Sequence, residues 1–268
     1  MPRCHDYRFL VRRWRALARA VGQPLQLLSA ASEFPVYVLR TAVAPHPGTI
    51  YLSAGIHGDE PAGPAALIEW AEKNMEPLRS RPFFLLSCLN PWGLLHNCRD
   101  DEAGRDLNRT FADKRPPAVV RELLRLIEGE RFALSLTLHE DYDANGFYVY
   151  EVMRQPPFWG EKLLRKVRPL IAIDSRARID RRRAFAGLVR RQFKPQRFPA
   201  MPESIYLHRR HSYRTFTTET PSEFALEQRI AAHVAAIEEC VRLSQMNPRE
   251  GNSWPRARTP SKLPLSPL

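Results

Sequence analysis

The feature that most constrains the fold is an alternation of short apolar segments with longer segments of helical periodicity. The segments TIYLSAG (49–55), PFFLLSCLN (82–90) and FALSLTLHE (132–140) are nearly continuous apolar runs rather than alternating ones. Strands of this kind are typical of parallel sheets that are covered by helices on both sides. The sequence therefore predicts an α/β fold with a mostly parallel sheet between two layers of helices.

The remaining elements follow from turn signals and apolar spacing. Further strands are predicted over 34–43, 146–152 and 213–221, and helices over 7–21, 61–75, 116–130, 158–171 and 222–245. Ser222 is the expected N-cap of the closing helix. We expect one catalytic domain over residues 1–245 and a disordered, basic, Pro- and Ser-rich tail over 246–268.

Composition limits the class of protein. The chain has 268 residues, of which 44% are hydrophobic, enough for one sizeable core. Its first segment carries arginines throughout, so neither a signal-peptide core nor a membrane span is predicted there. The four cysteines form no C-x-x-C pair. A cytoplasmic protein with reduced thiols and no membrane partner is therefore expected.

The formal net charge of +12 admits three explanations. Much of the excess lies in residues 162–214, which could bind nucleic acid or another polyanion, because phosphates attract clustered arginines. No helix-turn-helix, zinc-finger or RNA-binding signature accompanies the arginines, so a solvated basic face is favoured. Recruitment of acidic substrates is a third explanation. His208 and His211, in HRRH, are expected in an exposed basic loop.

Chemically capable side chains stand where the predicted strands end. His57 and Glu60 follow the strand over 49–55, His139 is near the end of the strand over 132–140, and Glu219 ends the strand TFTTE. In open α/β sheets, ligands bind beyond the carboxyl ends of the strands. Two imidazoles and one carboxylate match the three protein ligands of a catalytic zinc site.

Glu219 is the carboxylate left over at this edge, and zinc hydrolysis needs a base that is not a metal ligand. Each residue alone has an ordinary explanation. H-x-x-E occurs by chance, His139 could be a histidine satisfied in the core, and Glu219 could favour a helix N-terminus. The joint arrangement is what favours a zinc hydrolase.

The segment 90–111 is polar and glycine-broken, so no helix is expected in it. It presents Arg99, Arg105 and Arg109 together with Asn97 and Asn108. Arginine binds carboxylates bidentately, and a further arginine near a metal could stabilise an oxyanion. A surface loop with scattered charges is the alternative.

The order of these motifs resembles the zinc carboxypeptidase family of the carboxypeptidase A type, in its compact bacterial branch near succinylglutamate desuccinylase and aspartoacylase. The resemblance runs from about residue 36 to 240. The matching motifs are H-x-x-E at His57–Glu60, N-P-x-G at Asn90–Gly93, and R-x-x-x-x-G-x-D-L-N-R from Arg99 through Gly104, Asp106, Leu107 and Asn108 to Arg109. His139 matches the third zinc ligand, and Glu219 in TTETP the catalytic glutamate.

The resemblance implies a three-layer α/β/α sandwich around a mixed, mostly parallel eight-stranded sheet, and one zinc ion. By the same implication, zinc is bound by His57, Glu60 and His139. Glu219 activates water and returns its proton to the leaving amine, and Arg99 stabilises the oxyanion. The implied binders of the substrate's free carboxylate are Asn108 and Arg109.

The sequence departs from the family pattern at two places. Trp92 replaces the aspartate of N-P-D-G, and Asp101 replaces an asparagine common two residues after the first arginine. Tyr206 and Tyr213 are candidates for the family's mobile tyrosine, and either could be a core or surface residue. Asp59 could orient His57 or cap the following helix. These departures leave the substrate open.

We therefore expect a metallocarboxypeptidase that hydrolyses a peptide or amide bond next to a free carboxylate. An N-acyl amino acid deacylase of the desuccinylase or aspartoacylase kind, and a murein peptide amidase, are the enzymatic alternatives. The expected partner is a small peptide or acyl amino acid rather than nucleic acid. An inactive hydrolase fold that binds a polyanion is the alternative of a different class.

Overall fold

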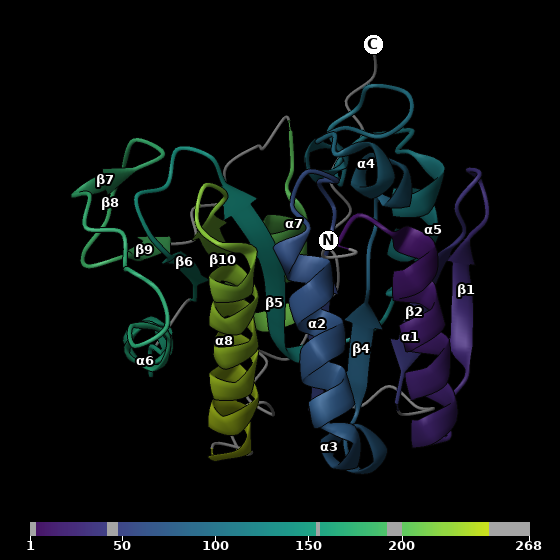
Figure 1. Ribbon diagram of the computed structural model, residues 1–268, viewed down its shortest axis with the longest axis horizontal. Coiled ribbons are helices and arrows are strands. Elements are labelled where there is room, and N and C mark those ends of the chain that lie inside the picture. Colours follow the sequence, from purple (N-terminus) through teal and green to yellow (C-terminus); the bar gives the residue numbers. More distant parts are fainter. Residues whose placement is uncertain (1–3, 42–47, 154–155, 192–199, 247–268) are drawn as a thin grey trace, which may run out of the picture.

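An eight-stranded mixed sheet forms the centre of the molecule (Figure 1). The computed structural model describes residues 4–41, 48–153, 156–191 and 200–246. The strand order is β1-β2-β4-β3-β5-β10-β6-β9, and the neighbouring strands β4, β3, β5 and β10 are all parallel. The strands of this sheet are β1 (Leu25–Ser29), β2 (Val36–Arg40), β3 (Thr49–Ala54), β4 (Phe83–Leu86), β5 (Phe132–Asp141), β6 (Tyr148–Val152), β9 (Leu188–Arg191) and β10 (Ser212–Pro221).

Helices cover both faces of the sheet, which confirms the predicted three-layer α/β/α sandwich (Figure 1). Helices α1, α2, α6 and α8 pack into one hydrophobic cluster, and α5 and α7 into the other. None of the helices in the described ranges is long and apolar enough to cross a membrane. The helices are α1 (Tyr7–Val21), α2 (Ala62–Lys73), α3 (Met75–Ser80), α4 (Pro91–His96), α5 (Ala118–Leu126), α6 (Gly160–Val167), α7 (Glu203–Arg210) and α8 (Leu226–Met246).

The continuous apolar segments form the middle of the sheet. Every residue of β3 and of β4 is buried, because helices cover both sides of these strands. Strand β5 lies between β3 and β10 and is parallel to both. The carboxyl ends of β3, β5 and β10 therefore meet at one edge of the sheet, where the candidate site lies.

Two local predictions are wrong. The segment 90–111 contains a short helix, α4, because the Asn90 side chain accepts a hydrogen bond from the Gly93 N–H and Pro91 suits the first helical position. Ser222 does not cap α8: the helix begins at Leu226, and the Ser222 hydroxyl is buried without a partner in the described structure. Helix α8 ends at Met246, and residues 247–268 of the expected tail lie outside the described residues.

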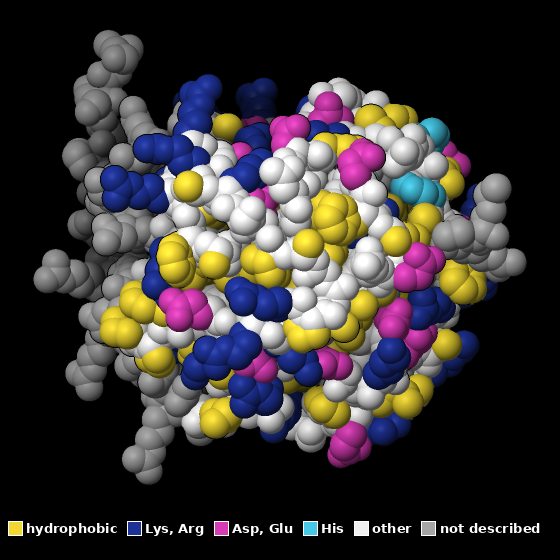
Figure 2. Space-filling model, turned by 60° about the vertical axis from the view of Figure 1, so that its left-hand side comes forward, with side chains coloured by type: hydrophobic (Ala, Val, Ile, Leu, Met, Phe, Trp, Pro, Cys, Tyr) yellow, Lys and Arg dark blue, Asp and Glu magenta, His cyan; other side chains and the backbone are white. Residues whose placement is uncertain are grey.

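The basic segment 162–214 is more structured than its composition suggested. It contains α7, β9 and a small hairpin of β7 (Arg178–Ile179) and β8 (Arg182–Arg183), none of which was predicted. The expectation of an exposed HRRH loop is wrong, because α7 packs on β5 and β10 and buries His208, while His211 donates to the Glu130 carbonyl. On the face shown in Figure 2, basic side chains are interspersed with acidic and hydrophobic ones.

Candidate metal centre and active site

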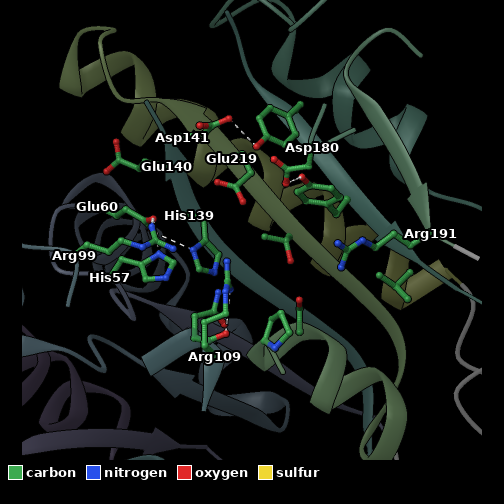
Figure 3. A pocket seen from close by; sticks show the side chains of 17 residues that line it. His57, Glu60, Arg99, Arg109, His139, Glu140, Asp141, Asp180, Arg191 and Glu219 are labelled. Atoms are coloured by element: carbon green, nitrogen blue, oxygen red, sulfur yellow. Dashed lines mark hydrogen bonds and ion pairs between the residues drawn. The ribbon is translucent and has the colours of Figure 1, made fainter. Parts of the chain in front are cut away.

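Three buried side chains converge at the carboxyl edge of the sheet. His57 and Glu60 lie in the turn between β3 and α2, and His139 lies near the end of β5. Their potential ligand atoms all lie within 4.8 Å of one another, and the three residues are only 2–4% exposed. Figure 3 shows the three side chains pointing toward one another at one end of a cavity.

The turn that holds His57 and Glu60 depends on two glycines. Gly55 has a φ of +63°, a conformation that residues with a Cβ rarely adopt. Gly58 faces α4 so closely that a Cβ there would lie 1.9 Å from the carbonyl carbon of Gly93. The N-P-x-G segment therefore packs directly against the turn of the H-x-x-E segment, and a side chain at residue 58 would separate them.

Hydrogen bonds align the two imidazoles on Glu60. His57 Nδ1 donates to Glu60 Oε1 at 2.6 Å, and His139 Nδ1 donates to Glu60 Oε2 at 3.0 Å. On its other side, His57 Nε2 donates to Asp106 Oδ1 at 3.2 Å. A carboxylate on the outer nitrogen of a histidine is the usual support of a metal-binding imidazole. Asp106 is part of the sequence motif, but no role was predicted for it. It thus orients His57, the role that was considered for Asp59.

Asp59 forms no hydrogen bond with His57 or with the first turn of α2 in the described structure. Its Oδ1 is buried and has no hydrogen-bond partner in the described part of the chain. Burial raises the pKa of the Asp59 carboxyl, and the nearby Glu60 carboxylate raises it further. The structure therefore supports neither the orientation of His57 nor the capping of α2 by Asp59.

The charges in this cluster suit a cation. Burial alone would lower the pKa of His57, but the Glu60 and Asp106 carboxylates outweigh it and raise the pKa to about 9. Burial opposes the charge of Glu60, yet the two histidines lower the pKa of this carboxyl to about 2. Each Nδ1 thus carries a proton that a metal ion would displace. Two imidazole nitrogens and one carboxylate oxygen that can reach the same ion are ligands that fit zinc. A site with three protein ligands leaves a coordination position open.

Glu219 lies beside this cluster on the neighbouring strand. It pairs in register with His139 across β10 and β5 and faces the same cavity (Figure 3). Burial raises the pKa of the Glu219 carboxyl well above its ordinary value; His139 opposes this rise and Glu60 adds to it. The carboxylate is therefore a stronger base than a solvated glutamate.

Arg99, Asn108 and Arg109 from the segment 90–111 also line the cavity, whereas Arg105 and Asn97 do not. Arg99 donates from Nη2 to Asp106 Oδ2 at 3.1 Å, and its Nη1 lies 3.7 Å from Glu60. Arg109 Nε lies 4.0 Å from the same Asp106 oxygen. The Asn108 Oδ1 accepts from the Glu203 N–H at 2.9 Å. Asp106 thus connects the His57 imidazole to two arginines.

Other residues at the cavity were missed by the sequence-based predictions. Tyr148 and Tyr150 line it, whereas Tyr206 and Tyr213, the predicted candidates, do not. The two tyrosines are two residues apart on β6, so their side chains point to the same face of the sheet. This spacing was the only signal in the sequence that could have found them. The other missed lining residues are Glu140, Val152, Asp180, Arg191, Pro202, Ser204 and Thr217, and Asp141 also lines the cavity.

Residues 47–158 match a catalytic domain family described as succinylglutamate desuccinylase/aspartoacylase. This match covers less than half of the chain. No protein of curated function matches the chain.

Solved structures share the fold over nearly the whole chain. A candidate metallopeptidase from Shewanella amazonensis superposes with a TM-score of 0.79 and 23% identity over 90% of this chain and 94% of the other. A second, from Shewanella baltica, superposes with a TM-score of 0.80 and 22% identity, covering 90% and 93%. A metallo-carboxypeptidase from Pseudomonas aeruginosa, solved in complex with (2-guanidinoethylmercapto)succinic acid, superposes with a TM-score of 0.61 and 16% identity, covering 90% and 69%.

These likenesses support the family that the sequence motifs indicated. The match over residues 47–158 includes His57, Glu60, Asn108, Arg109 and His139, and the fold extends the likeness to the strand of Glu219. Residues 47–158 are therefore similar to the succinylglutamate desuccinylase/aspartoacylase catalytic domain, and nearly the whole chain shares the fold of the solved metallopeptidase structures.

Proposed function

We propose that this protein is a zinc-dependent hydrolase that cleaves a peptide or amide bond next to a free carboxylate. The observation that carries the proposal is the placement of Glu219. It pairs in register with His139 and faces the cavity that the cluster of His57, Glu60 and His139 also lines. A separate carboxylate beside a three-ligand site is what metal-assisted hydrolysis requires.

Zinc in such a site acts as a Lewis acid and makes water acidic enough to be a nucleophile near neutral pH. Glu219 accepts the proton of the attacking water. The same carboxyl group then donates this proton to the nitrogen of the leaving amine. Because burial raises the pKa of the Glu219 carboxyl, this group accepts the proton more readily than a solvated glutamate does and holds it until the leaving amine takes it.

Asn108 and Arg109 bind the free carboxylate of the substrate in this proposal. The side-chain oxygen of Asn108, Oδ1, already accepts a hydrogen bond from the Glu203 N–H, so the side-chain amide nitrogen is the donor available to a ligand. Arg109 is about half exposed and lies at the cavity, so its guanidinium can form a bidentate pair. Arg99, beside Glu60, stabilises the negative charge that develops on the carbonyl oxygen.

The second candidate is an N-acyl amino acid deacylase, in which the same residues act on a single acyl-amide bond. The family match over residues 47–158 supports this candidate as well as the first. The cavity supports a small substrate in either case, since its volume of about 240 Å³ is small for a ligand pocket. The two candidates differ in the acyl side of the substrate, not in the machinery.

The test is to measure bound zinc and the turnover of blocked dipeptides, acyl amino acids and murein peptides. His57→Ala should lose the metal. Glu219→Gln should keep it and lose turnover by roughly 10²–10⁴-fold, the usual contribution of a general base. The control is Glu69→Gln, which should change neither quantity, because the Glu69 carboxylate on α2 is partly exposed and pairs with Lys73.

Full turnover by Glu219→Gln would remove this residue from the mechanism. A metal-free wild-type protein that binds DNA with a steep salt dependence would favour the inactive, polyanion-binding alternative instead.

A further inference from the structure

Glu140 is a buried carboxylate at the candidate site, and the proposed reaction makes no use of it. It follows His139 directly in β5, and its side chain is fully buried. Successive side chains of a strand point to opposite faces of the sheet, so Glu140 points away from His139. Figure 3 shows the Glu140 carboxylate beside Glu60 and turned away from Glu219.

The Glu140 carboxylate binds two groups that come from distant parts of the chain. Its Oε1 accepts a hydrogen bond from the Ala62 N–H at 2.7 Å. Its Oε2 accepts a hydrogen bond from Arg229, which lies in the first turn of α8 and is itself largely buried. Both carboxylate oxygens thus have partners, so Glu140 is not available as a second base. It connects β5 to α2 and to α8 instead.

The contact with Ala62 supplies a cap that α2 lacks. Ala62 is the first residue of α2, and Pro61, which precedes it, makes no side-chain hydrogen bond to the helix. The first turn of α2 contains no acidic residue either. It also lies directly against β5, since a Cβ at Gly63 would lie 3.2 Å from the Cβ of Leu138. Because the free N–H groups of a helix N-terminus favour a carboxylate, Glu140 caps α2 from the neighbouring strand.

This cap lies next to two of the candidate metal ligands. Ala62 is two residues after Glu60, and Glu140 is the residue after His139. One hydrogen bond therefore joins the backbone segments that carry Glu60 and His139, although these two ligands are 79 positions apart in the sequence. Loss of this bond would let the N-terminus of α2 shift relative to β5 and would change the separation of the two ligands.

We propose that Glu140 is a positioning residue, which fixes the separation of the metal ligands Glu60 and His139 through its hydrogen bond to the Ala62 N–H. Arg229 compensates the charge of the buried carboxylate and holds it in the orientation of this bond. The inference rests on the zinc site of the proposed function, and it adds a residue that acts on the metal geometry without binding the metal.

The test separates the hydrogen bond to Ala62 from the ion pair with Arg229. Removal of Glu140 alone would leave Arg229 buried without its anion, which is destabilising in itself. Two double variants avoid this cost, because neither buries an unpaired charge. Glu140→Leu with Arg229→Met removes both charges and the acceptor, whereas Glu140→Gln with Arg229→Met keeps an oxygen that can accept from Ala62. Urea denaturation reports the stability of each variant.

Two measurements report the metal site independently of any substrate. Zinc affinity is measured by competition with a chromogenic chelator, and the coordination geometry is followed by the visible absorption of the Co²⁺-loaded protein. The Glu140→Leu double variant should bind zinc about 10–100-fold more weakly and show an altered Co²⁺ spectrum, which is the usual effect of losing a group that orients metal ligands. The Glu140→Gln double variant should match the wild type in both measurements, because it keeps the bond to Ala62.

The matched control is Glu72→Leu with Arg13→Met. Arg13 and Glu72 form an ion pair of 2.6 Å that joins α1 to the other end of α2. Its loss weakens the attachment of the same helix far from the metal ligands. Zinc affinity and the Co²⁺ spectrum should therefore not change.

Wild-type zinc affinity in the Glu140→Leu double variant would overturn the proposal. Equal losses in the two Glu140 double variants would also overturn it, since the acceptor for the Ala62 N–H would then have no part in the effect. Failure of the proposed function looks different: the wild-type protein hydrolyses no member of the substrate panel, while its zinc affinity and the order of the variants are as expected.

Discussion

The hydrogen bond between Asp106 and His57 offers the sharpest test of the candidate metal centre. Asp106 Oδ1 accepts from His57 Nε2 at 3.2 Å, on the side of the imidazole that faces away from Glu60. Removing such a supporting carboxylate typically weakens metal binding by about 10–100-fold. This corresponds to about 1.4–2.7 kcal/mol of binding free energy.

The two ends of this range correspond to two substitutions. Asp106→Asn keeps an oxygen that can accept from His57 and removes only the charge, so zinc affinity should fall by about tenfold. Asp106→Ala removes the acceptor as well and should cost about a hundredfold. Zinc affinity is measured by competition with a chromogenic chelator at constant pH, which reports metal binding whatever the substrate is.

The control is Asp101→Asn in the same loop. Asp101 pairs with Arg105 at 2.7 Å and does not contact His57, so a general disturbance of the loop would appear in both variants. Unchanged zinc affinity in Asp106→Ala would refute the reasoning. Equal losses in the Asp106 and Asp101 variants would assign the effect to the loop instead.

Two further perturbations test the packing around the site. Gly58→Ala would place a methyl carbon 1.9 Å from the Gly93 carbonyl carbon, so we expect a loss of roughly 2–3 kcal/mol in urea denaturation and weaker zinc binding. His233 is fully buried, and burial lowers its pKa from 6.5 to about 3. The unfolded chain therefore binds this proton below pH 6.5 and the folded chain does not, so stability is full above pH 6.5 and falls by about 2 kcal/mol at pH 5.

Each of these expectations has its own control. Gly104→Ala adds a methyl group where no atom lies within 4 Å, so it should keep zinc binding even though its positive φ is strained. His233→Gln removes the titrating group, and its stability should depend about 2 kcal/mol less on pH between 7 and 5 than that of the wild type. If the stability of the wild type and of His233→Gln changed equally with pH, the expectation for His233 would be contradicted. Normal zinc binding by Gly58→Ala would contradict the expectation for Gly58.

Much of the fold followed from local patterns. The continuous apolar runs of β3, β4 and β5 predicted a covered sheet, because such strands need helices on both faces. Residues whose structure depends on contacts with distant elements were predicted less well. Asn90 caps a helix that the polar composition of its segment did not predict. His208 is buried although arginines follow it in the sequence. In both cases, contacts with distant elements outweigh local composition.

The amino-acid sequence predicted that His57, Glu60 and His139 lie close together at one edge of the sheet, and the structure brings them together. His57, Glu60, His139 and Glu219 all lie at or beyond the carboxyl ends of parallel strands, and the apolar segments before them are local signals that predict these strands. Only the tertiary structure decided what surrounds them. Asp106 reaches His57 across 49 positions, and Arg191 enters the cavity because β9 adds to the edge of the sheet. Such contacts depend on how strands and loops pack, and sequence periodicity carries no information about that packing.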